Sequence, residues 1–382
     1  AAGRVRALDM ILVGPRGVGK TAAVSAFAGL AREQGFEVIN LQAVTGQAGL
    51  VPSLLRQASS RIADGAGPWQ RAKTLFERIG GFDLSVAGFG AGLSMRDRDP
   101  VAQISDAETL AAALSALATE TRKEHATGGV MLTVDELQVA SAPDLALIAA
   151  MLHRLNVDHP SSVVAFAGTG LPHTPHALRR AGVTHPDRLF VVEPIPLTLT
   201  PEDARYAIVE PARRAGVMWE PPAADRIVDV SGGYPAHLQL FADATWRLSQ
   251  GPQRITIADV ERAIPDAASQ IERRSLGPRW DRISDRQMEF MAALALLGGQ
   301  ASTAQVAKAL GREQREISWI REELITEGDI YAPRRGQLSM SVPLFRSYVL
   351  SRYEAQRPEG ESRLLSLEAM HANLAHELDT RH

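Results

Sequence analysis

Cysteine and long hydrophobic runs are both missing from the sequence, and each absence excludes a class of protein. Without cysteine there are no disulfide bonds, no thiolate metal sites and no cysteine nucleophile. Without an apolar run of about 20 residues, no membrane-spanning helix is expected. The chain also does not open with the apolar core of a secretory signal. We therefore expect a cytoplasmic protein that makes no contact with a membrane.

The sequence also has no large excess of positive or negative charge. The 41 Lys and Arg residues are nearly balanced by 44 Asp and Glu residues, which gives a formal net charge of −3. No global attraction to nucleic acid follows from this charge, and only a local basic patch could supply one. Hydrophobic residues make up 45% of the chain and charged residues 22%, which is ordinary for a globular protein. The length of 382 residues predicts two or three domains.

A glycine-rich loop, GPRGVGKT, follows an apolar run at residues 7–13 that predicts a buried strand. Glycines let successive backbone N–H groups point at the β- and γ-phosphates of a nucleotide; the lysine adds a mobile cation, and the threonine hydroxyl completes the shell of Mg²⁺. A helix follows the loop, and its N-terminus favours anions. We expect ATP or ADP to bind here, the alternative being a degenerate loop. The residues concerned are Gly14, Pro15, Arg16, Gly17, Val18, Gly19, Lys20 and Thr21.

A second buried strand, VMLTV, is followed by two acidic residues, Asp135 and Glu136. Acids at the carboxyl end of a strand lie at the ligand-binding edge of an α/β sheet. We expect Asp135 to hold Mg²⁺ together with Thr21, and Glu136 to act as general base on the attacking water. A small-molecule kinase activates a substrate hydroxyl and has less need of the second acid, so hydrolysis is favoured over phosphate transfer. A solvated acidic pair after a strand is the alternative.

Two further residues extend the predicted catalytic set. The strand SSVVAFAGTG places Thr169 near its polar end, where it would report on the γ-phosphate or the attacking water, or simply form a turn. Arg188 precedes a strand predicted from Phe190, and could reach the γ-phosphate of a neighbouring subunit. Arg179 and Arg180 are the other candidates for that role. A surface salt bridge is the competing explanation for each of the three arginines.

The two nucleotide motifs are separated by more residues than a compact nucleotide domain needs. We assign residues 46–104 to an insertion, in which the partly alternating, glycine-containing stretch 80–95 predicts a β-hairpin. The hairpin would contact a partner or a neighbouring subunit, or cover the core. Ser105 and Glu108 form a capping box, which predicts that a helix begins at this position.

In this order, GPRGVGKT, VMLTVDE, VVAFAGTG and DRLF resemble the motifs of AAA+ ATPases and the related STAND ATPases. The resemblance covers residues 7–196. It implies an α/β P-loop NTPase fold of the ASCE class, with strand order 5-1-4-3-2, followed by a small α-helical lid. It also implies Mg²⁺-dependent ATP hydrolysis, to which Lys20 would contribute, and a homo-oligomer if Arg188 completes a neighbour's site.

The lid would comprise residues 197–280. Thr200, Pro201 and Asp203 predict the start of its first helix, because they supply a side-chain cap, a proline in the first turn and an acid near the N-terminus. SGGYP, which ends at Pro235, differs from AAA+ enzymes, since these generally carry a sensor arginine at the start of a lid helix. It is more similar to the Gly-x-Pro motif of STAND and archaeal-type ATPases. That resemblance places Pro235 near the adenine; a plain helix-start proline is the alternative.

Residues 281–355 predict a separate module. A short helix closes at Gly311, a second helix runs from Arg312 to Thr326, and two short strands flank a basic turn. This order indicates a helix-turn-helix followed by a wing. It resembles the winged-helix domain that follows the lid in origin-recognition initiators and archaeal-type ATPases. Residues 356–382 predict a last helix, which packs on the protein's own body or on a partner.

Double-stranded DNA and protein are the two partners considered for this module. Against DNA, helix 312–327 holds three Arg and five Glu, a net charge of −2, which is unfavourable for a helix that enters a groove. Winged helices also serve as protein contacts or as clamps that hold a switch closed. The residues that would contact DNA are Arg312, Gln314, Arg315 and Ser318 on the second helix and Arg334 and Arg335 in the wing.

The leading interpretation is an ATP-hydrolysing switch or motor that couples its nucleotide state to DNA contact in replication, transposition or another DNA transaction. The alternative is a STAND-like signalling or scaffold ATPase that holds ADP and opens for a protein partner. A phosphotransferase is the third interpretation. The histidines His173, His176 and His185 lack nearby acids at ligand spacing, so we interpret them as loop residues rather than a metal site.

Overall fold

The computed structural model describes residues 9–44, 49–65, 67–80, 100–249 and 253–355. The chain forms two compact units, the first ending at Ile195 and the second beginning at Pro196, and the four residues Pro15–Val18 group with the second unit. Each unit is therefore described by itself. Within the described ranges, no helix is long and apolar enough to cross a membrane.

A five-stranded parallel sheet forms the centre of the first unit, with the order β2-β3-β4-β1-β5. Its central strands are runs of Val, Ile, Leu and Ala that are buried on both faces, as expected of a parallel sheet covered by helices. The predicted order 5-1-4-3-2 is confirmed. The strands are β1 (Asp9–Val13), β2 (Glu37–Gln42), β3 (Val130–Asp135), β4 (Val164–Gly170) and β5 (Phe190–Pro194).

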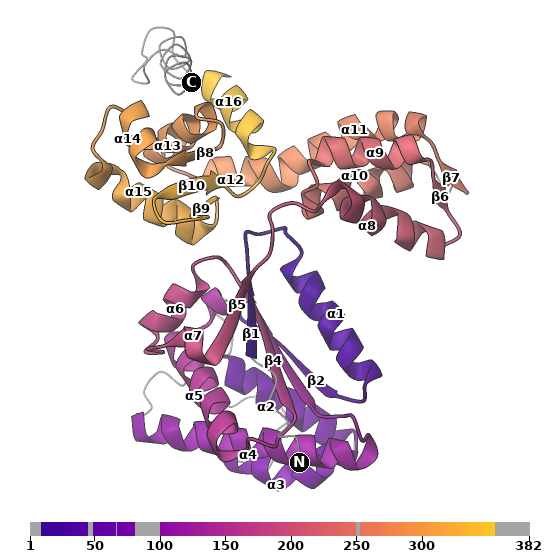
Figure 1. Cartoon of the computed structure of the whole chain (residues 1–382), viewed down its shortest axis with the longest axis vertical. Coiled ribbons are helices and arrows are strands. Elements are labelled where there is room, and N and C mark those ends of the chain that lie inside the picture. The colour runs from indigo at the N-terminus through magenta and orange to yellow at the C-terminus, as the bar shows by residue number, and fades with distance from the viewer. Residues whose placement is uncertain (1–8, 45–48, 66, 81–99, 250–252, 356–382) are drawn as a thin grey trace, which may run out of the picture. The chain divides into compact units, whose positions relative to one another are not determined.

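Helices cover both faces of this sheet (Figure 1). Helix α1 (Lys20–Glu33) packs on one face, where Val24 and Ala28 join Leu12 and Val38 in a small apolar cluster. The other face carries the larger core, to which α2, α4 and α5 contribute. The helices of this unit after α1 are α2 (Leu50–Ala63), α3 (Gly67–Gly80), α4 (Pro100–Glu124), η2 (Leu137–Val139), α5 (Ala142–Asp158), α6 (Thr174–Arg180) and α7 (Pro186–Leu189).

The range assigned to an insertion contains two helices. Helices α2 and α3 occupy much of residues 46–104, and the rings of Trp69 and Phe76 in α3 lie 5.4 Å apart in the buried core. The predicted hairpin at 80–95 lies outside the described residues except for Gly80, which ends α3. The helix start predicted at Ser105 is wrong, because α4 already begins at Pro100 and the serine lies inside the helix.

The second unit begins with a group of helices that occupies the range for which a lid was predicted. Helix α8 starts as expected: the Thr200 hydroxyl accepts a hydrogen bond from the N–H of Asp203, with Pro201 as the first helical residue. Two short strands pair in parallel within this group. Its elements are α8 (Pro201–Arg214), β6 (Met218–Trp219), α9 (Pro221–Ser231), α10 (Pro235–Leu248), β7 (Arg254–Ile255), α11 (Ile257–Ile271), the π-helical turn η3 (Glu272–Leu276) and α12 (Gly277–Arg282).

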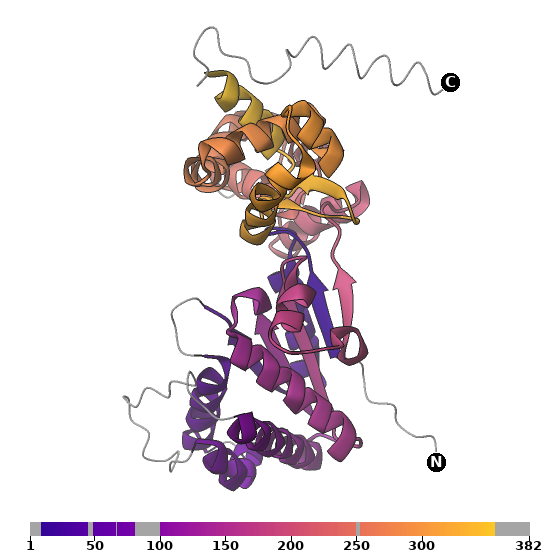
Figure 2. The same cartoon turned by 90° about the vertical axis from the view of Figure 1, so that its left-hand side faces the viewer.

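The C-terminal segment of this unit combines four helices with a three-stranded antiparallel sheet of order β8-β10-β9, the orange-to-yellow part of Figures 1 and 2. Two helices, α14 and α15, are joined by a short turn, and β9 and β10 form a hairpin after them. The elements are α13 (Asp285–Leu296), β8 (Gln300–Ser302), α14 (Thr303–Ala309), α15 (Gln314–Glu327), β9 (Ile330–Tyr331), β10 (Gln337–Met340) and α16 (Phe345–Ala355).

A buried ionic cluster joins α12 to this segment. Asp329, in the turn between α15 and β9, is fully buried, and its two carboxylate oxygens accept hydrogen bonds from Arg279 at 2.8 Å and from Arg282 at 2.7 Å. A buried carboxylate requires such partners, since an unpaired charge in the interior is costly. The cluster fixes the start of the β9–β10 hairpin relative to α12.

Candidate functional site

The glycine-rich loop leaves β1 and ends at the first residue of α1. Gly17 and Gly19 have φ values of 82° and 93°, in the left-handed region that favours glycine. Lys20 is buried, and its ammonium donates a hydrogen bond to the carbonyl oxygen of Gly14 at 3.0 Å. The N–H of Gly14 donates in turn to the carbonyl of Gly170 at 3.2 Å, which ties the beginning of the loop to the end of β4. Gly14 at the start of the loop is thus fixed by hydrogen bonds to Lys20 and Gly170, while the positive φ values of Gly17 and Gly19 allow the rest of the loop to turn.

Three side chains from different elements meet at the carboxyl edge of the sheet. The hydroxyl of Thr21, on α1, donates to Oδ2 of Asp135 at 2.8 Å, and the hydroxyl of Thr169, on β4, donates to Oδ1 of the same carboxylate. Hydroxyl and carboxylate oxygens suit Mg²⁺, which binds proteins through few ligands and keeps waters and phosphate oxygens in its shell. Within the described parts of the chain, no group of three or more His, Asp or Glu could hold a metal ion. The hydroxyl of Thr21 and the carboxylate of Asp135 are oxygen donors of this kind, so the two residues fit Mg²⁺ that arrives with a nucleotide.

Glu136 follows this carboxylate with an unusual backbone conformation. Its φ of 59° is the one positive φ of a non-glycine residue in the part of the chain that the structure describes. Its N–H donates both to Asp135 Oδ1 at 3.0 Å and to the hydroxyl of Thr169 at 3.2 Å. Its carboxylate oxygen Oε2 accepts a hydrogen bond at 2.7 Å from the side-chain amide of Gln138, a residue that the sequence analysis did not single out.

Tyr234 of the SGGYP motif and Ala236, the residue after the motif, contact the tip of the glycine-rich loop within the second unit. The N–H of Ala236 donates to the carbonyl of Gly17 at 3.1 Å, and the hydroxyl of Tyr234 donates to the carbonyl of Arg16. A Cβ at Gly17 would lie 2.3 Å from that hydroxyl, so glycine is required here for space as well as for its φ. Pro235 is the first residue of α10, as expected of a helix-start proline, and it lies between the two residues that touch the loop.

Two buried titratable rings follow the same motif. Burial raises the pKa of Tyr234 to about 12, partly opposed by the positive charge of Arg279. Burial, and then the same charge, lower the pKa of His237 to about 4. The two rings pack edge to face with centroids 4.6 Å apart. Both side chains are therefore neutral near pH 7 in the folded protein.

Arg188 lies away from the carboxyl edge of the sheet. It is exposed in α7, immediately before β5, whose first residue Phe190 pairs with Asp9 at the start of β1. The glycine-rich loop follows the other end of β1, so the structure does not bring Arg188 to the phosphate loop of its own chain. Arg179 and Arg180, at the end of α6, are also exposed.

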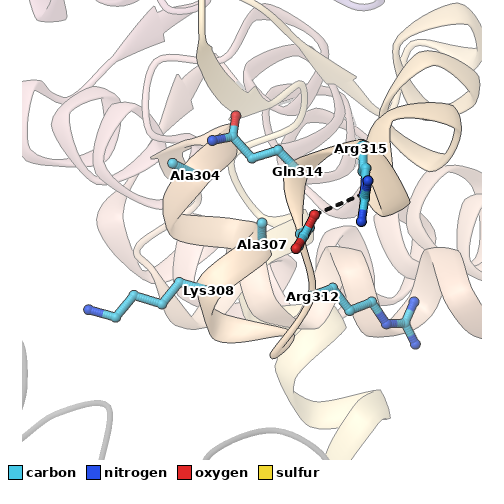
Figure 3. A pocket seen from close by; sticks show the side chains of 7 residues that line it. Ala304, Ala307, Lys308, Arg312, Gln314 and Arg315 are labelled. Atoms are coloured by element: carbon cyan, nitrogen blue, oxygen red, sulfur yellow. Dashed lines mark ion pairs between the residues drawn. The ribbon is translucent and has the colours of Figure 1, made fainter.

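The residues predicted to contact DNA lie at two places. Arg312, Gln314 and Arg315 line a hollow of about 580 Å³ between α14 and α15, together with Ala304, Ala307, Lys308 and Glu313 (Figure 3). Ser318 is exposed further along α15, and its hydroxyl donates to the carbonyl of Arg315 at 2.8 Å. Arg334 and Arg335 are exposed in the turn between β9 and β10.

Carboxylates accompany two of the predicted DNA contacts. The guanidinium of Arg312 is paired with Glu289 at 2.9 Å, and that of Arg315 with Glu313 at 2.9 Å, the pair marked in Figure 3. Because the second pair is largely exposed, solvent screens it and it contributes little stability. An approaching phosphate could therefore compete for Arg315 at small cost.

Comparison with protein families gives two matches. Residues 1–164 match the AAA ATPase domain, and residues 274–349 match a domain of unknown function. A comparison with curated proteins found no match.

Comparison with solved structures gives matches at low sequence identity. The Walker-type ATPase PABY2304 of Pyrococcus abyssi aligns with a TM-score of 0.56 and 16% identity, over 90% of each chain. The ORC2 protein of Aeropyrum pernix, in complexes with ADPNP and ADP, aligns with a TM-score of 0.47 and 14% identity over 91% of this chain and 89% of that one. A RuvB variant of Thermotoga maritima gives 0.43 and 15%, over 92% and 89%.

The family match and the sheet agree on one class of protein. The matched residues include the glycine-rich loop, Asp135 and Glu136, and the parallel sheet has the strand order of P-loop ATPases. The sequence prediction of an ATPase is thereby confirmed. The chain carries an AAA ATPase domain of the P-loop fold over residues 1–164, and the protein is an ATPase.

Proposed function

We propose that the protein is a Mg²⁺-dependent ATP-hydrolysing switch or motor that couples its nucleotide state to contact with double-stranded DNA. The observation that carries the nucleotide half of this proposal is the meeting of Thr21, Asp135 and Thr169 beside Glu136. Four residues from α1, β3 and β4 are brought together there, although more than 30 residues separate each motif from the next.

In this proposal the loop Gly14–Thr21 surrounds the phosphates. Its backbone N–H groups and Lys20 neutralise the β- and γ-phosphates, while Thr21 and Asp135 hold Mg²⁺. The bond from Lys20 to the Gly14 carbonyl shows that the ammonium already lies within the loop, where a phosphate oxygen can replace the carbonyl as its partner. Pro235 borders the adenine, next to the residues that contact the tip of the loop.

Glu136 acts as the general base on the attacking water, and Thr169 reports on the γ-phosphate or that water. A carboxylate at hydrogen-bond distance from water is suited to accept its proton. Thr169 contacts both the N–H of Glu136 and the Asp135 carboxylate, so a movement of β4 would change the positions of both acids. The presence of Glu136 as a second acid favours hydrolysis over phosphate transfer to a small molecule.

The DNA half of the proposal concerns the C-terminal segment, which we interpret as a winged helix. Helices α14 and α15 would form its helix-turn-helix, and the β9–β10 hairpin its wing. Arg312, Gln314, Arg315 and Ser318 would meet a groove, and the exposed Arg334 and Arg335 the phosphates. The hollow between α14 and α15 also presents the exposed Lys308, which adds to its positive charge.

Contacts within the second unit provide a physical route for this coupling. The tip of the glycine-rich loop touches Tyr234, the charge of Arg279 acts on Tyr234 and His237, and Arg279 bonds to Asp329 at the start of the hairpin. A change at the loop that moved Tyr234 would therefore alter the electrostatic environment of Arg279, which bonds to Asp329 at the start of the hairpin. The route supports coupling between the loop and the C-terminal segment.

A protein partner is the alternative for the C-terminal segment. Helix 312–327 has a net charge of −2, and the guanidiniums of Arg312 and Arg315 are paired with carboxylates. Trp319 is 42% exposed on the same helix and lies 5.9 Å from the guanidinium of Arg286. An exposed tryptophan beside ion pairs is more typical of a protein contact than of a DNA groove.

The test is steady-state ATP hydrolysis with and without duplex DNA at low salt. Glu136→Gln should bind ATP and lose hydrolysis by about 10²-fold or more, and Lys20→Ala should lose nucleotide affinity. Unchanged turnover in Glu136→Gln would refute the assignment of the base. Recovery of phosphate on a small molecule, without free phosphate, would favour the phosphotransferase.

DNA binding is tested by titrating duplex DNA at several salt concentrations. Replacing Arg334 and Arg335 by Ala should weaken binding and reduce the dependence of log affinity on log salt by about one unit for each arginine replaced. Arg226→Ala is the matched control, since it removes an exposed arginine that pairs with Glu261 elsewhere in the second unit. Absence of binding even at low salt would refute the DNA half and favour the protein partner.

A further inference from the structure

Glu136 needs an external constraint before it can act as a base. The left-handed backbone at this residue is unfavourable for a residue with a Cβ, and the side chain has three rotatable bonds that the backbone does not restrain. The hydrogen bonds of its N–H hold the peptide group but not the carboxylate. A partner for the carboxylate itself is required if the base is to point in one direction.

Gln138 is that partner, and the direction of its amide is determined by its surroundings. The backbone N–H of Leu171 lies 3.1 Å from Oε1 of Gln138. An N–H can only donate, so the amide oxygen must face Leu171, and the NH₂ group must face the other way. Nε2 then donates to Oε2 of Glu136 at 2.7 Å. The side chain bridges the end of β4 and the acid after β3.

Packing beneath the bridge holds the turn that carries it. Leu137, in the 3₁₀ turn with Gln138, is buried at 1% exposure against Gly168 of β4. A Cβ added at Gly168 would lie 2.4 Å from a methyl group of Leu137, which shows how closely the turn approaches the strand. The amide of Gln138 therefore starts from a fixed backbone position.

The bridge leaves the base free to react. Oε2 of Glu136 is occupied by the amide, whereas no hydrogen bond to Oε1 is found among the described residues. Oε1 thus retains its lone pairs for a water molecule. An NH₂ group donates to a carboxylate without competing for a proton, as a second carboxylate would.

We propose that Gln138 is a positioning residue for ATP hydrolysis: its amide, anchored on the N–H of Leu171, aims the carboxylate of Glu136 at the attacking water. This inference rests on the proposed role of Glu136 as base. It connects the base to the same end of β4 that carries Thr169, which contacts Asp135, and Gly170, which receives the N–H of Gly14. The carboxyl end of β4 then positions the phosphate loop, the acid that holds Mg²⁺ and, through Gln138, the base.

Three variants test this role in the full chain. Gln138→Leu removes both hydrogen bonds, and Gln138→Glu keeps an acceptor for Leu171 but places a negative charge beside Glu136. Both should lower kcat for ATP by about 10- to 100-fold, as loss of an orienting partner does, while KM and nucleotide affinity change by less than about threefold. Gln70→Leu is the matched control: it removes the side-chain hydrogen bond of another glutamine, which donates to the backbone carbonyl of Ile62, and should leave kcat unchanged.

A double-mutant cycle separates positioning from a general structural effect. Gln138 acts through Glu136, so Gln138→Leu should reduce the residual rate of Glu136→Gln by less than about twofold. Wild-type kcat in both Gln138 variants would overturn the inference, and so would a full additional loss in the Glu136→Gln background. Full hydrolysis by Glu136→Gln itself would instead refute the proposed base, which distinguishes the two failures.

Discussion

Buried His237 predicts that the protein loses stability on acidification. Its side chain is 1% exposed, and neither ring nitrogen has a hydrogen-bond partner among the described residues. It packs against Tyr234, and the positive charge of Arg279 disfavours its charged form. Burial, followed by the charge of Arg279, lowers its pKa from 6.5 to about 4.

The size of the effect follows from the two pKa values. In the unfolded chain His237 should titrate near pH 6.5, so the unfolded state binds the proton more strongly than the folded one. The free energy of unfolding is therefore highest above pH 6.5, falls as the pH decreases through 6.5, and levels off below about 4. At about 1.4 kcal/mol per pKa unit, the total loss is about 3 kcal/mol, of which about 2 kcal/mol occurs between pH 8 and pH 5.

Urea unfolding at pH 8 and pH 5, followed by circular dichroism, measures this loss. His237→Leu removes the titrating group without leaving a hydrogen bond unmade, so its stability should fall by about 2 kcal/mol less than that of the wild type. His153→Leu, which replaces an exposed histidine of α5, is the control and should behave as the wild type does. Equal losses in the wild type and His237→Leu would refute the reasoning.

Three further predictions concern other parts of the chain. Asp329→Ala leaves two arginines without their buried partner and should lower the free energy of unfolding by about 3 kcal/mol. Asp243→Ala, the control, breaks an exposed ion pair and should lower it by less than about 1 kcal/mol. Equal losses of the two variants in urea unfolding would contradict this prediction. Gly168→Ala should displace Leu137 and lower kcat about tenfold while ATP binding persists; a wild-type kcat would show that the turn tolerates the shift. Arg188→Ala should impair hydrolysis only in an assembled form, which a concentration series with light scattering can test; a monomer that hydrolyses ATP at the assembled rate would exclude a role for Arg188 at the γ-phosphate of a neighbouring subunit.

The sheet was predictable because its strands carry their signals locally. Each of β1, β3 and β4 is an apolar run followed by a glycine, an acid or a hydroxyl at the ligand-binding edge. The resemblance that these motifs carry supplied the strand order, which the structure confirms. The start of α8 was predictable for the same local reason, since Thr200 needs only the N–H of Asp203, three residues away.

Local signals were insufficient around residues 46–104. Helix α2 buries Leu54, Ala58 and Ile62 at helical spacing, so a periodic pattern was present in a range assigned to an insertion. The capping box at Ser105 misled the prediction, because a serine followed three residues later by a glutamate also occurs inside a helix. Whether such a pair begins a helix depends on what precedes it, and here α4 already extends back to Pro100.

Gln138 and Asp329 show what local patterns cannot contain. The anchor of Gln138 is the N–H of Leu171, 33 residues further along the chain, and the partners of Asp329 lie 47 and 50 residues before it. Nothing in the residues beside either side chain specifies such partners, since these contacts exist only once strand ends and helix ends have come together. The phosphate loop could be recognised from eight consecutive residues because it binds largely through its own backbone. The contacts that hold Glu136 and the start of the β9–β10 hairpin are tertiary, and they can be identified only in the folded chain.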